Sequence, residues 1–408
     1  MDLSILEGAD ALQIHCKHMR CAFIVECKRI HFIEVHMANL WESHFRRFKI
    51  LFLILWALTA LIGGSILGYW LFSVQRQNLE ASMRNHSARI DPLANESGKT
   101  EAARTPPPGH EHDSPAYVKV GMYVDRVPEL SIKDSTWTAD FYIWFLWTDE
   151  KLNPGETFQV VNGEIKSRDI LESRDLNGSH YALYRVVAEI TKAFDITRFP
   201  RDDHLLTISI EDTRLQSYQF QYLAYDTQSD ISSRVSLPGY KIYRHAGAVK
   251  PHSYKTARGD PGLPKDYKAT YAQFTYGIWI ARPDWGLYLK MFLTLYAALF
   301  IALIGFFIKP SDRFGLAIGS FFAAVANSYI TSSLIPDTGT ATLADQINAI
   351  GMLVIALVIF QSIVSQVFHS REGWADYGKQ LDMVSFACLL VITITLNIIL
   401  PVAASLPT

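Results

Sequence analysis

Five long apolar runs constrain the fold of this chain more than any other feature of its sequence. They are Ile50–Phe72, Leu287–Ile308, Arg313–Ile335, Ile347–Val367 and Met383–Ala404. Each run is long enough to cross a hydrocarbon core of roughly 30 Å as a helix. Charged residues make up only 19% of the 408 residues and the net charge is −2. The sequence therefore predicts a membrane protein, and nothing in its charge indicates a nucleic-acid partner.

Basic residues near the ends of these runs predict the orientation of the chain. They lie before the first run, near the connection between the second and third runs, and near the connection between the fourth and fifth runs. These residues are Arg46, Arg47, Lys49, Lys309, Arg313, Arg371 and Lys379. The connection Pro336–Gln346 has no Lys or Arg. Because positive charge collects on the cytoplasmic side of membrane proteins, we expect the N-terminus inside the cell. The segment between the first two runs and the C-terminus then lie outside.

The region before the second run is predicted to hold three parts. Residues 1–47 form a cytoplasmic segment, 48–72 a retained signal-anchor helix, and 73–114 a polar, disordered tether. The sequence from Met37 is typical of a signal anchor, so we interpret the residues before it as an artefact of start-codon choice. An alternative for this segment is a metal site, but the spacing of its candidate ligands matches no known zinc motif: His15, Cys16, His18, Cys21 and Cys27.

Residues 115–283 follow a period of two, which is typical of β-strands. Apolar and polar residues alternate along Tyr117–Val124, Trp137–Trp147 and His204–Ile210. Short strands separated by turn signals predict an all-β, immunoglobulin-like sandwich. None of the four cysteines lies in this segment, so we expect no disulfide there. Residues 284–405 are predicted to form a domain of four transmembrane helices.

One of the apolar runs is too polar for a helix that faces only lipid. Ser311–Pro336 carries Asn, Ser and Thr through its second half. Helical spacing places an acid, small residues and two aromatic rings on one stripe: Asp312, Gly315, Gly319, Phe322, Ala326, Tyr329 and Ser333. Such a stripe can line water. The two glycines also form a small-residue motif for helix packing, so the residues alone leave both interpretations open.

The chain carries several motifs in a fixed order. Val118–Leu152 ends in Trp-x-Asp-x-x-Leu, and Phe194–Glu211 contains a Phe-Pro-x-Asp turn. Tyr243–Arg282 has the pattern of a β-hairpin that ends the β region and is followed by an arginine. Ser311–Gln346 contains the polar apolar run, which is followed by a proline. Together these segments resemble the pentameric ligand-gated ion channels. The resemblance covers residues 117–405.

The resemblance implies a homopentameric ligand-gated channel that conducts inorganic ions and is opened by a small molecule or a proton. It implies no cofactor, no metal site and no catalytic residue. The lack of cysteines beside Phe199-Pro200 places the chain in the prokaryotic branch. We therefore expect a bacterial inner membrane, with the β domain in the periplasm. Three features depart from the family. Leu287–Ile308 lacks the usual proline, the Trp-x-Pro-Asp segment is missing between Leu152 and Phe194, and the N-terminal anchor is extra.

The resemblance assigns the stripe on Ser311–Pro336 to the pore. A ring of Asp312 carboxylates would favour cations, and Phe322 and Tyr329 would form apolar constrictions that close by dewetting. The ordinary alternatives are that Asp312 only pairs with Arg313 or lies among lipid headgroups, and that the two rings contact neighbouring helices.

The resemblance also assigns a ligand site and a coupling region. The ligand site takes one wall from Glu211, Arg214, Tyr254 and Tyr267, and the other from Tyr142 and Trp144 of a neighbouring subunit. Aromatic rings there would hold an amine by cation–π contacts. The coupling residues are Lys133, Asp134, Phe199, Pro200, Asp202, Arg282 and Pro336. We expect an ion pair between Arg282 and either Asp202 or Asp134.

Two rival functions stay open. A non-conducting sensor or scaffold of the same fold fits the missing proline and the bulky rings of the stripe. An enzyme is disfavoured, because the only dense polar cluster, Arg201–His204, lies in the predicted coupling turn. The sequence has no nucleophile elbow, metal box or phosphate loop.

Overall fold

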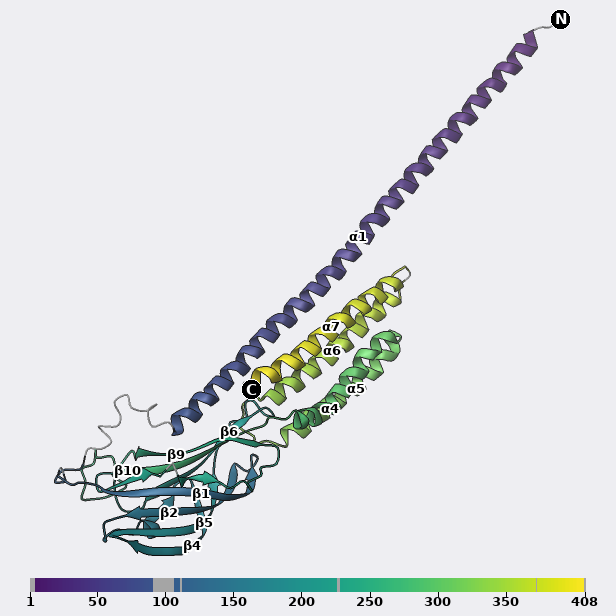
Figure 1. Ribbon diagram of the computed structural model, residues 1–408. Coiled ribbons are helices and arrows are strands. Elements are labelled where there is room, and N and C mark those ends of the chain that lie inside the picture. Colours follow the sequence, from purple (N-terminus) through teal and green to yellow (C-terminus); the bar gives the residue numbers. More distant parts are fainter. Residues whose placement is uncertain (1–3, 91–105, 111, 226–227, 372, 407–408) are drawn as a thin grey trace.

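The computed structural model describes the backbone of residues 4–90, 106–110, 112–225, 228–371 and 373–406, and the side chains of these ranges from Arg47 onward. A β domain is followed by a group of long helices, and one very long helix precedes both (Figure 1). Five of the described helices are long and apolar enough to cross a membrane. The coarse expectation of a β domain joined to membrane helices is therefore confirmed.

The helices lie close to the predicted runs. They are α1 Ser4–Ile90, α4 Gly286–Ile304, α5 Pro310–Ser332, α6 Leu343–His369 and α7 Ala375–Ala404. Pro310 begins α5, where its missing N–H costs no hydrogen bond. Thr342 and Asp345 form a reciprocal capping box that begins α6. A short 3-10 turn, Gly305–Phe307, ends α4.

The first helix is longer than the sequence analysis predicted. Residues 73–90, expected as part of a disordered tether, continue α1 without a break. They contain no Pro or Gly, and one face of this part of the helix is buried at helical spacing, at Leu71, Gln75, Leu79, Ser82 and Ile90. That packing is what stabilises the extension. Residues 91–105, also assigned to the tether, and the side chains of the candidate metal cluster before Arg47 lie outside the described part.

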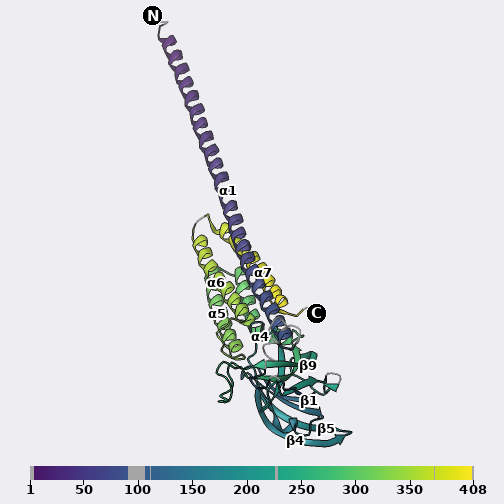
Figure 2. The ribbon, with the colours of Figure 1, turned by 90° about the vertical axis from the view of Figure 1, so that its left-hand side faces the viewer.

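The N-terminal helix packs against the last helix, α7. Figures 1 and 2 both show α1 running beside α7. An added Cβ at Gly64 would meet Ile392 at 2.8 Å, and one at Gly68 would meet Leu396 at 2.8 Å. The Trp56 indole also donates a hydrogen bond to Ser385 (3.0 Å). Gly64 and Gly68 are thus a small-residue packing motif, which the sequence analysis did not identify.

The β domain consists of two sheets over a common core. One sheet has the order β4-β5-β2-β1-β7, with β8 also paired to β1: Gly163–Leu176, Ser179–Thr191, Thr136–Trp147, Ala116–Ser131, Phe220–Ala224 and Asp230–Ile231. The other has the order β3-β6-β10-β9: Phe158–Val160, Asp203–Asp212, Thr270–Ala281 and Lys241–Ser253. The short helix α3, Pro154–Thr157, precedes β3.

The alternation predicted from the sequence is visible in the core. Trp137, Phe141 and Phe145 of β2 are completely buried, and they share one apolar cluster with Ile208 of β6 and Phe274 of β10. Side chains at every second position of a strand point to one face, so the period of two produces this inner face.

All the junctions between the β domain and the helices lie at one end of the helical group. The N–H groups of Leu343 and Ala344, at the start of α6, donate to the carbonyls of Thr197 (2.9 Å) and Phe199 (3.1 Å). The C-terminal end of α7 lies at the same end, and the α6–α7 connection lies at the far end (Figures 1 and 2). The basic connections and the β domain are therefore on opposite sides of the helical group.

Candidate pore helix and domain junction

The stripe predicted to line a pore lies on the exposed face of α5. Asp312, Gly315, Gly319, Ala326 and Ser333 are all exposed in the single chain. So are the two large rings, with exposed fractions of 69% for Phe322 and 79% for Tyr329. Within the subunit, the rings are therefore not buried against other helices.

The two glycines of the stripe make no close packing contact within the described part of the chain. A Cβ built on Gly315 or Gly319 would find no atom within 4 Å, apart from its own helix. The glycines on the α1–α7 contact behave differently, since a Cβ there meets a neighbouring side chain at 2.8 Å. Gly315 and Gly319 thus do not serve helix packing inside the subunit.

The opposite face of α5 is buried and carries a charged anchor. The Arg313 guanidinium is 1% exposed and forms a bidentate ion pair with Asp382 of α7, at 3.0 and 2.8 Å. It also donates to the carbonyl of Gly305 (3.0 Å). Asp382 accepts further hydrogen bonds from Ser365 (2.7 Å) and Gln361 (3.4 Å) of α6. A buried ion pair needs such extra partners to offset desolvation.

This pair removes one alternative for Asp312. The sequence analysis allowed that Asp312 pairs only with Arg313, but Arg313 points to the buried side and binds Asp382. Asp312 stays at the exposed start of α5, where the Ser311 hydroxyl donates to it (3.2 Å). Adjacent helical residues point in directions about 100° apart, which explains why Asp312 and Arg313 face different surroundings.

Further along α5, the buried face is held by amide and hydroxyl groups. Asn327 donates to Asn348 of α6 (2.9 Å). Asn348 in turn donates to the Thr331 hydroxyl (2.8 Å) and to the Ala344 carbonyl (3.0 Å). Arg313, Asn327 and Thr331 on the buried face are therefore bonded within the chain, whereas Ser320 is buried there with no hydrogen-bond partner among the described residues.

The predicted coupling turn is centred on a buried carboxylate. Asp202, 1% exposed, accepts from the Arg282 guanidinium at 2.8 Å, from His204 Nε2 at 2.6 Å and from the Tyr240 hydroxyl at 3.0 Å. The Arg282 guanidinium also lies 3.9 Å from the centre of the Tyr240 ring. Of the two expected partners of Arg282, the structure selects Asp202. Asp134 bonds locally to the Ser131 hydroxyl at 2.5 Å.

Charge fixes the protonation state of this carboxylate. Burial acts to raise the pKa of Asp202, but the hydrogen bond from His204 and the charge of Arg282 outweigh it and hold the pKa below its ordinary value. Burial also lowers the pKa of His204. Asp202 is therefore an anion that ties β6 to the chain segment entering α4.

Two arginines near Asp202 bind the end of α7 and the segment before α4. Arg198 donates to the Ala404 carbonyl at the end of α7 (2.9 Å) and pairs with Asp203. Arg201 donates to the Ser405 hydroxyl (2.8 Å) and to the Asp284 carbonyl before α4 (3.1 Å). The sequence analysis gave neither arginine a role. Four consecutive charged or titratable residues at the start of strand β6, Arg201–His204, were the signal that could have found this network.

The remaining coupling residues lie around the same junction or at exposed turns. Phe199 and Pro200 are buried in the turn that receives the start of α6. Pro336 is half-buried in the loop between α5 and α6. Lys133 is exposed at the β1–β2 turn.

The first wall of the predicted ligand site is built around another buried carboxylate. Glu211 is completely buried and accepts from the Tyr254 hydroxyl (2.9 Å) and the Gln273 amide (2.7 Å). Burial, helped by this hydrogen bond, raises the pKa of Tyr254 to about 12. The Tyr267 hydroxyl donates to Gln216 (2.9 Å). In this arrangement Glu211 is bonded inside the subunit rather than presented to a ligand.

The other predicted ligand residues are more accessible. Arg214 is exposed. Tyr142 and Trp144 lie half-buried on the outer face of β2, where Trp144 covers Gly121 so closely that a Cβ there would overlap its ring. They belong to a different sheet from Glu211.

Comparisons with models of known protein families and with curated proteins found no match for this chain. The fold and the site geometry are thus the observations from which its function has to be argued.

Proposed function

We propose that this chain is the subunit of a homopentameric, cation-selective, ligand-gated ion channel of a bacterial inner membrane. The exposed stripe of α5 is the observation that carries the proposal. It combines an acid, small residues and two large rings, while Arg313 and Asn327 on the opposite face are bonded within the chain. A ring of subunits repeats each stripe residue around an axis, and rings of carboxylates and apolar side chains are the elements of a gated pore.

The junction between the β domain and the helices supports the proposal that ligand binding to the β domain opens the channel. Asp202 and its neighbours connect strand β6 to the starts of α4 and α6 and to the end of α7 through charged groups and backbone hydrogen bonds. A displacement of β6 would therefore act on these three helix ends. The immunoglobulin-like sandwich and the agonist site between subunits belong to this same proposal.

Mass measurement and single-channel recording test the proposal. The full chain, purified in detergent, is expected to have the mass of a pentamer, and its reconstitution in planar bilayers should give cation currents. Pentamers without current under all ligand and pH conditions would favour the non-conducting sensor. A monomer or dimer would overturn the assignment of the stripe to a pore.

Thiol labelling tests the membrane orientation separately. Single cysteines at Ser114 and Thr340 are expected to react with an impermeant reagent in whole cells with a permeable outer membrane, whereas one at Glu372 should not. Labelling at Glu372 alone would reverse the orientation and would contradict the placement of the β domain in the periplasm.

A further inference from the structure

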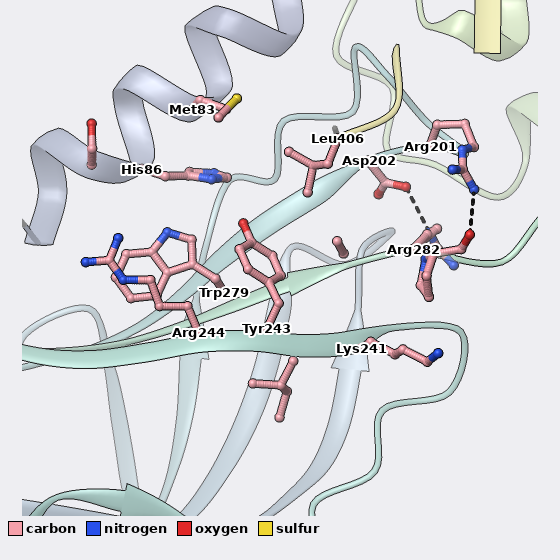
Figure 3. Close-up of a pocket in the computed structure, with 14 residues that line it drawn as sticks. Met83, His86, Arg201, Asp202, Lys241, Tyr243, Arg244, Trp279, Arg282 and Leu406 are labelled. Atoms are coloured by element: carbon pink, nitrogen blue, oxygen red, sulfur yellow. Dashed lines mark hydrogen bonds and ion pairs between the residues drawn. The ribbon is translucent and has the colours of Figure 1, made fainter. Parts of the chain in front are cut away.

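Two cavities border the last turns of α1. The larger, about 620 Å³, lies between α1 and strands β9 and β10 (Figure 3). Two of its basic side chains, Lys241 and Arg244, extend toward opposite ends of the cavity, so they cannot hold one ligand group together. The smaller cavity, about 350 Å³, lies at the end of α1 and is lined mainly by polar side chains. Ligand sites in proteins commonly have volumes of about 300–1,000 Å³.

The smaller cavity lies on the outer face of the sheet β3-β6-β10-β9. Ile208 of β6 belongs to the shared core, so Thr207 and Ser209 on either side of it point outward. Both line the cavity, together with Thr275 of β10. The Asn162 side chain donates to the Thr207 carbonyl (2.8 Å) and accepts from the Ser209 N–H (3.0 Å). These two bonds fix the turn between β3 and β4 as one wall of the cavity.

The last turn of α1 is held against the sheet beside this cavity. Ile90 is buried in a small apolar cluster of the sheet, and a Cβ on Gly277 would overlap its side chain. Lys250 of β9 donates to the Ala88 carbonyl (2.7 Å), so a basic side chain already complements the C-terminal end of this helix. Arg89, the next residue, lines the cavity.

Two cationic side chains line the cavity without an acid to balance them. They are Arg89 and Lys192, which directly follows β5, and none of the described lining residues is an acid. Neither cation has an ion-pair partner among the described residues. Asp195, whose charge acts on Lys192, accepts hydrogen bonds from the Thr197 N–H (3.0 Å) and hydroxyl (2.7 Å). Burial and the charge of Arg89 lower the pKa of Lys192 to about 8. A bound anion would offset this repulsion.

The other side chains of the cavity suit a hydrophilic ligand. The hydroxyls of Thr191 and Thr207 donate no hydrogen bond within the described part of the chain. Phosphate oxygens accept hydrogen bonds from hydroxyl groups and form stronger, charge-assisted bonds with Arg and Lys. The only apolar side chains among the described lining residues are Val161 and Ala193. The cavity therefore has donors for an oxyanion and little surface for an acyl chain.

We propose that this cavity binds the phosphate group of a small, water-soluble molecule, with Lys192 and Arg89 as the cations and the Thr191 and Thr207 hydroxyls as further donors. The proposal goes beyond the proposed channel function and depends on neither assembly nor conduction, because all the lining residues belong to one chain. A ligand bound there would contact both α1 and the β domain and would hold the end of α1 on the sheet.

Isothermal titration calorimetry of the purified full chain in detergent tests this proposal, with glycerol 3-phosphate, inorganic phosphate and glycerol as probes. Both phosphate compounds are expected to bind, whereas glycerol should not, because it carries no charge. Lys192→Gln combined with Arg89→Gln should weaken binding by roughly a hundredfold, since each hydrogen bond to a charged group contributes on the order of a tenfold factor. Lys265→Gln combined with Lys268→Gln removes the same charge from an exposed loop of the β domain and should leave binding unchanged.

A second variant and a stability measurement keep the outcome decisive. Ala193→Trp fills the cavity without changing its charge, and it should also abolish the binding of both phosphate compounds. Without ligand, the Lys192→Gln and Arg89→Gln double variant should unfold at an unchanged or higher temperature, because it removes two cations that repel each other. A lower unfolding temperature would show that these cations serve the fold itself and would contradict the proposal.

Three binding results would also overturn the proposal. They are no binding of either phosphate compound at millimolar concentration, equal binding of glycerol, and equal losses in the control variant. The measurement needs no pentamer and no current, so its failure is separate from a failure of the channel assignment.

Discussion

Both faces of α5 carry polar residues, but one face is buried against other helices of the chain and the other is exposed. On the buried face, Arg313 and Asn327 reach partners on α7 and α6. On the exposed face, Phe322 and Tyr329 project from the subunit, and the glycines between them and Asp312 touch no neighbouring element of the described chain. Polarity in a membrane helix therefore does not by itself identify a pore. What separates the two faces is whether the side chains are buried against other helices of the chain or exposed.

The largest expected effect comes from the buried face. Asp382→Ala should lower the free energy of unfolding by about 3–5 kcal/mol, because it leaves the Arg313 charge buried without its partner. The measurement is thermal unfolding of the purified protein, together with the yield of assembled protein. Asp312→Ala, the same truncation on the exposed face, is the control and should leave the unfolding temperature nearly unchanged. Equal losses of stability in both variants would contradict the distinction between the buried and exposed faces.

The second prediction concerns the gate. Phe322→Ala should give current without agonist, since removing the ring would widen and wet the apolar constriction of the proposed pore. Tyr329→Ala should leak less, because its hydroxyl binds water and already weakens dewetting. Recording in bilayers gives the measurement, and Phe314→Ala, an exposed ring of α5 outside the stripe, is the control. Well-assembled pentamers that stay silent after Phe322→Ala would remove this residue as the gate.

The third prediction concerns charge selectivity. Asp312→Ala should move the reversal potential in a salt gradient toward anion permeability, because it would remove the carboxylate ring that the proposed pentamer carries at the start of α5. Asp337→Ala removes an exposed acid beyond the other end of α5 and should have a smaller effect. A wild-type channel that already prefers chloride would show that Asp312 does not set selectivity.

The smallest expected effect again concerns a residue of the buried face. Asn327→Ala removes the hydrogen bond to Asn348 and should cost about 0.6 kcal/mol, a typical value for one such bond between membrane helices. Unfolding in detergent measures this, and reversal potential and basal current should not change. Ser332→Ala, whose hydroxyl bonds a carbonyl of its own helix, should cost less. An altered basal current in Asn327→Ala would mean that this face also takes part in gating.

The sequence predicted elements whose signal is local. The strands Tyr117–Val124 and Trp137–Trp147 were found because an alternating pattern specifies which side chains are buried in a sheet. The apolar helices were found because the length of each run nearly matches a membrane span. The continuation of α1 to Ile90 was missed, since its buried face packs on elements that are remote in the sequence.

The candidate site also has a part that local sequence patterns predict and a part that only the packing of remote segments creates. The sequence placed Asp312, Phe322 and Tyr329 on one stripe, because helical periodicity alone fixes which residues share a face. It did not show that Arg313 binds Asp382, or that Arg282 binds Asp202 rather than Asp134. These partners are separated by long stretches of chain. Only the packing of α5 and α7 against α6, and of β6 beside the segment before α4, brings the charges within hydrogen-bonding distance. Tertiary structure also formed the cavity between α1 and strands β9 and β10 (Figure 3), because its walls come from segments that have no common sequence pattern.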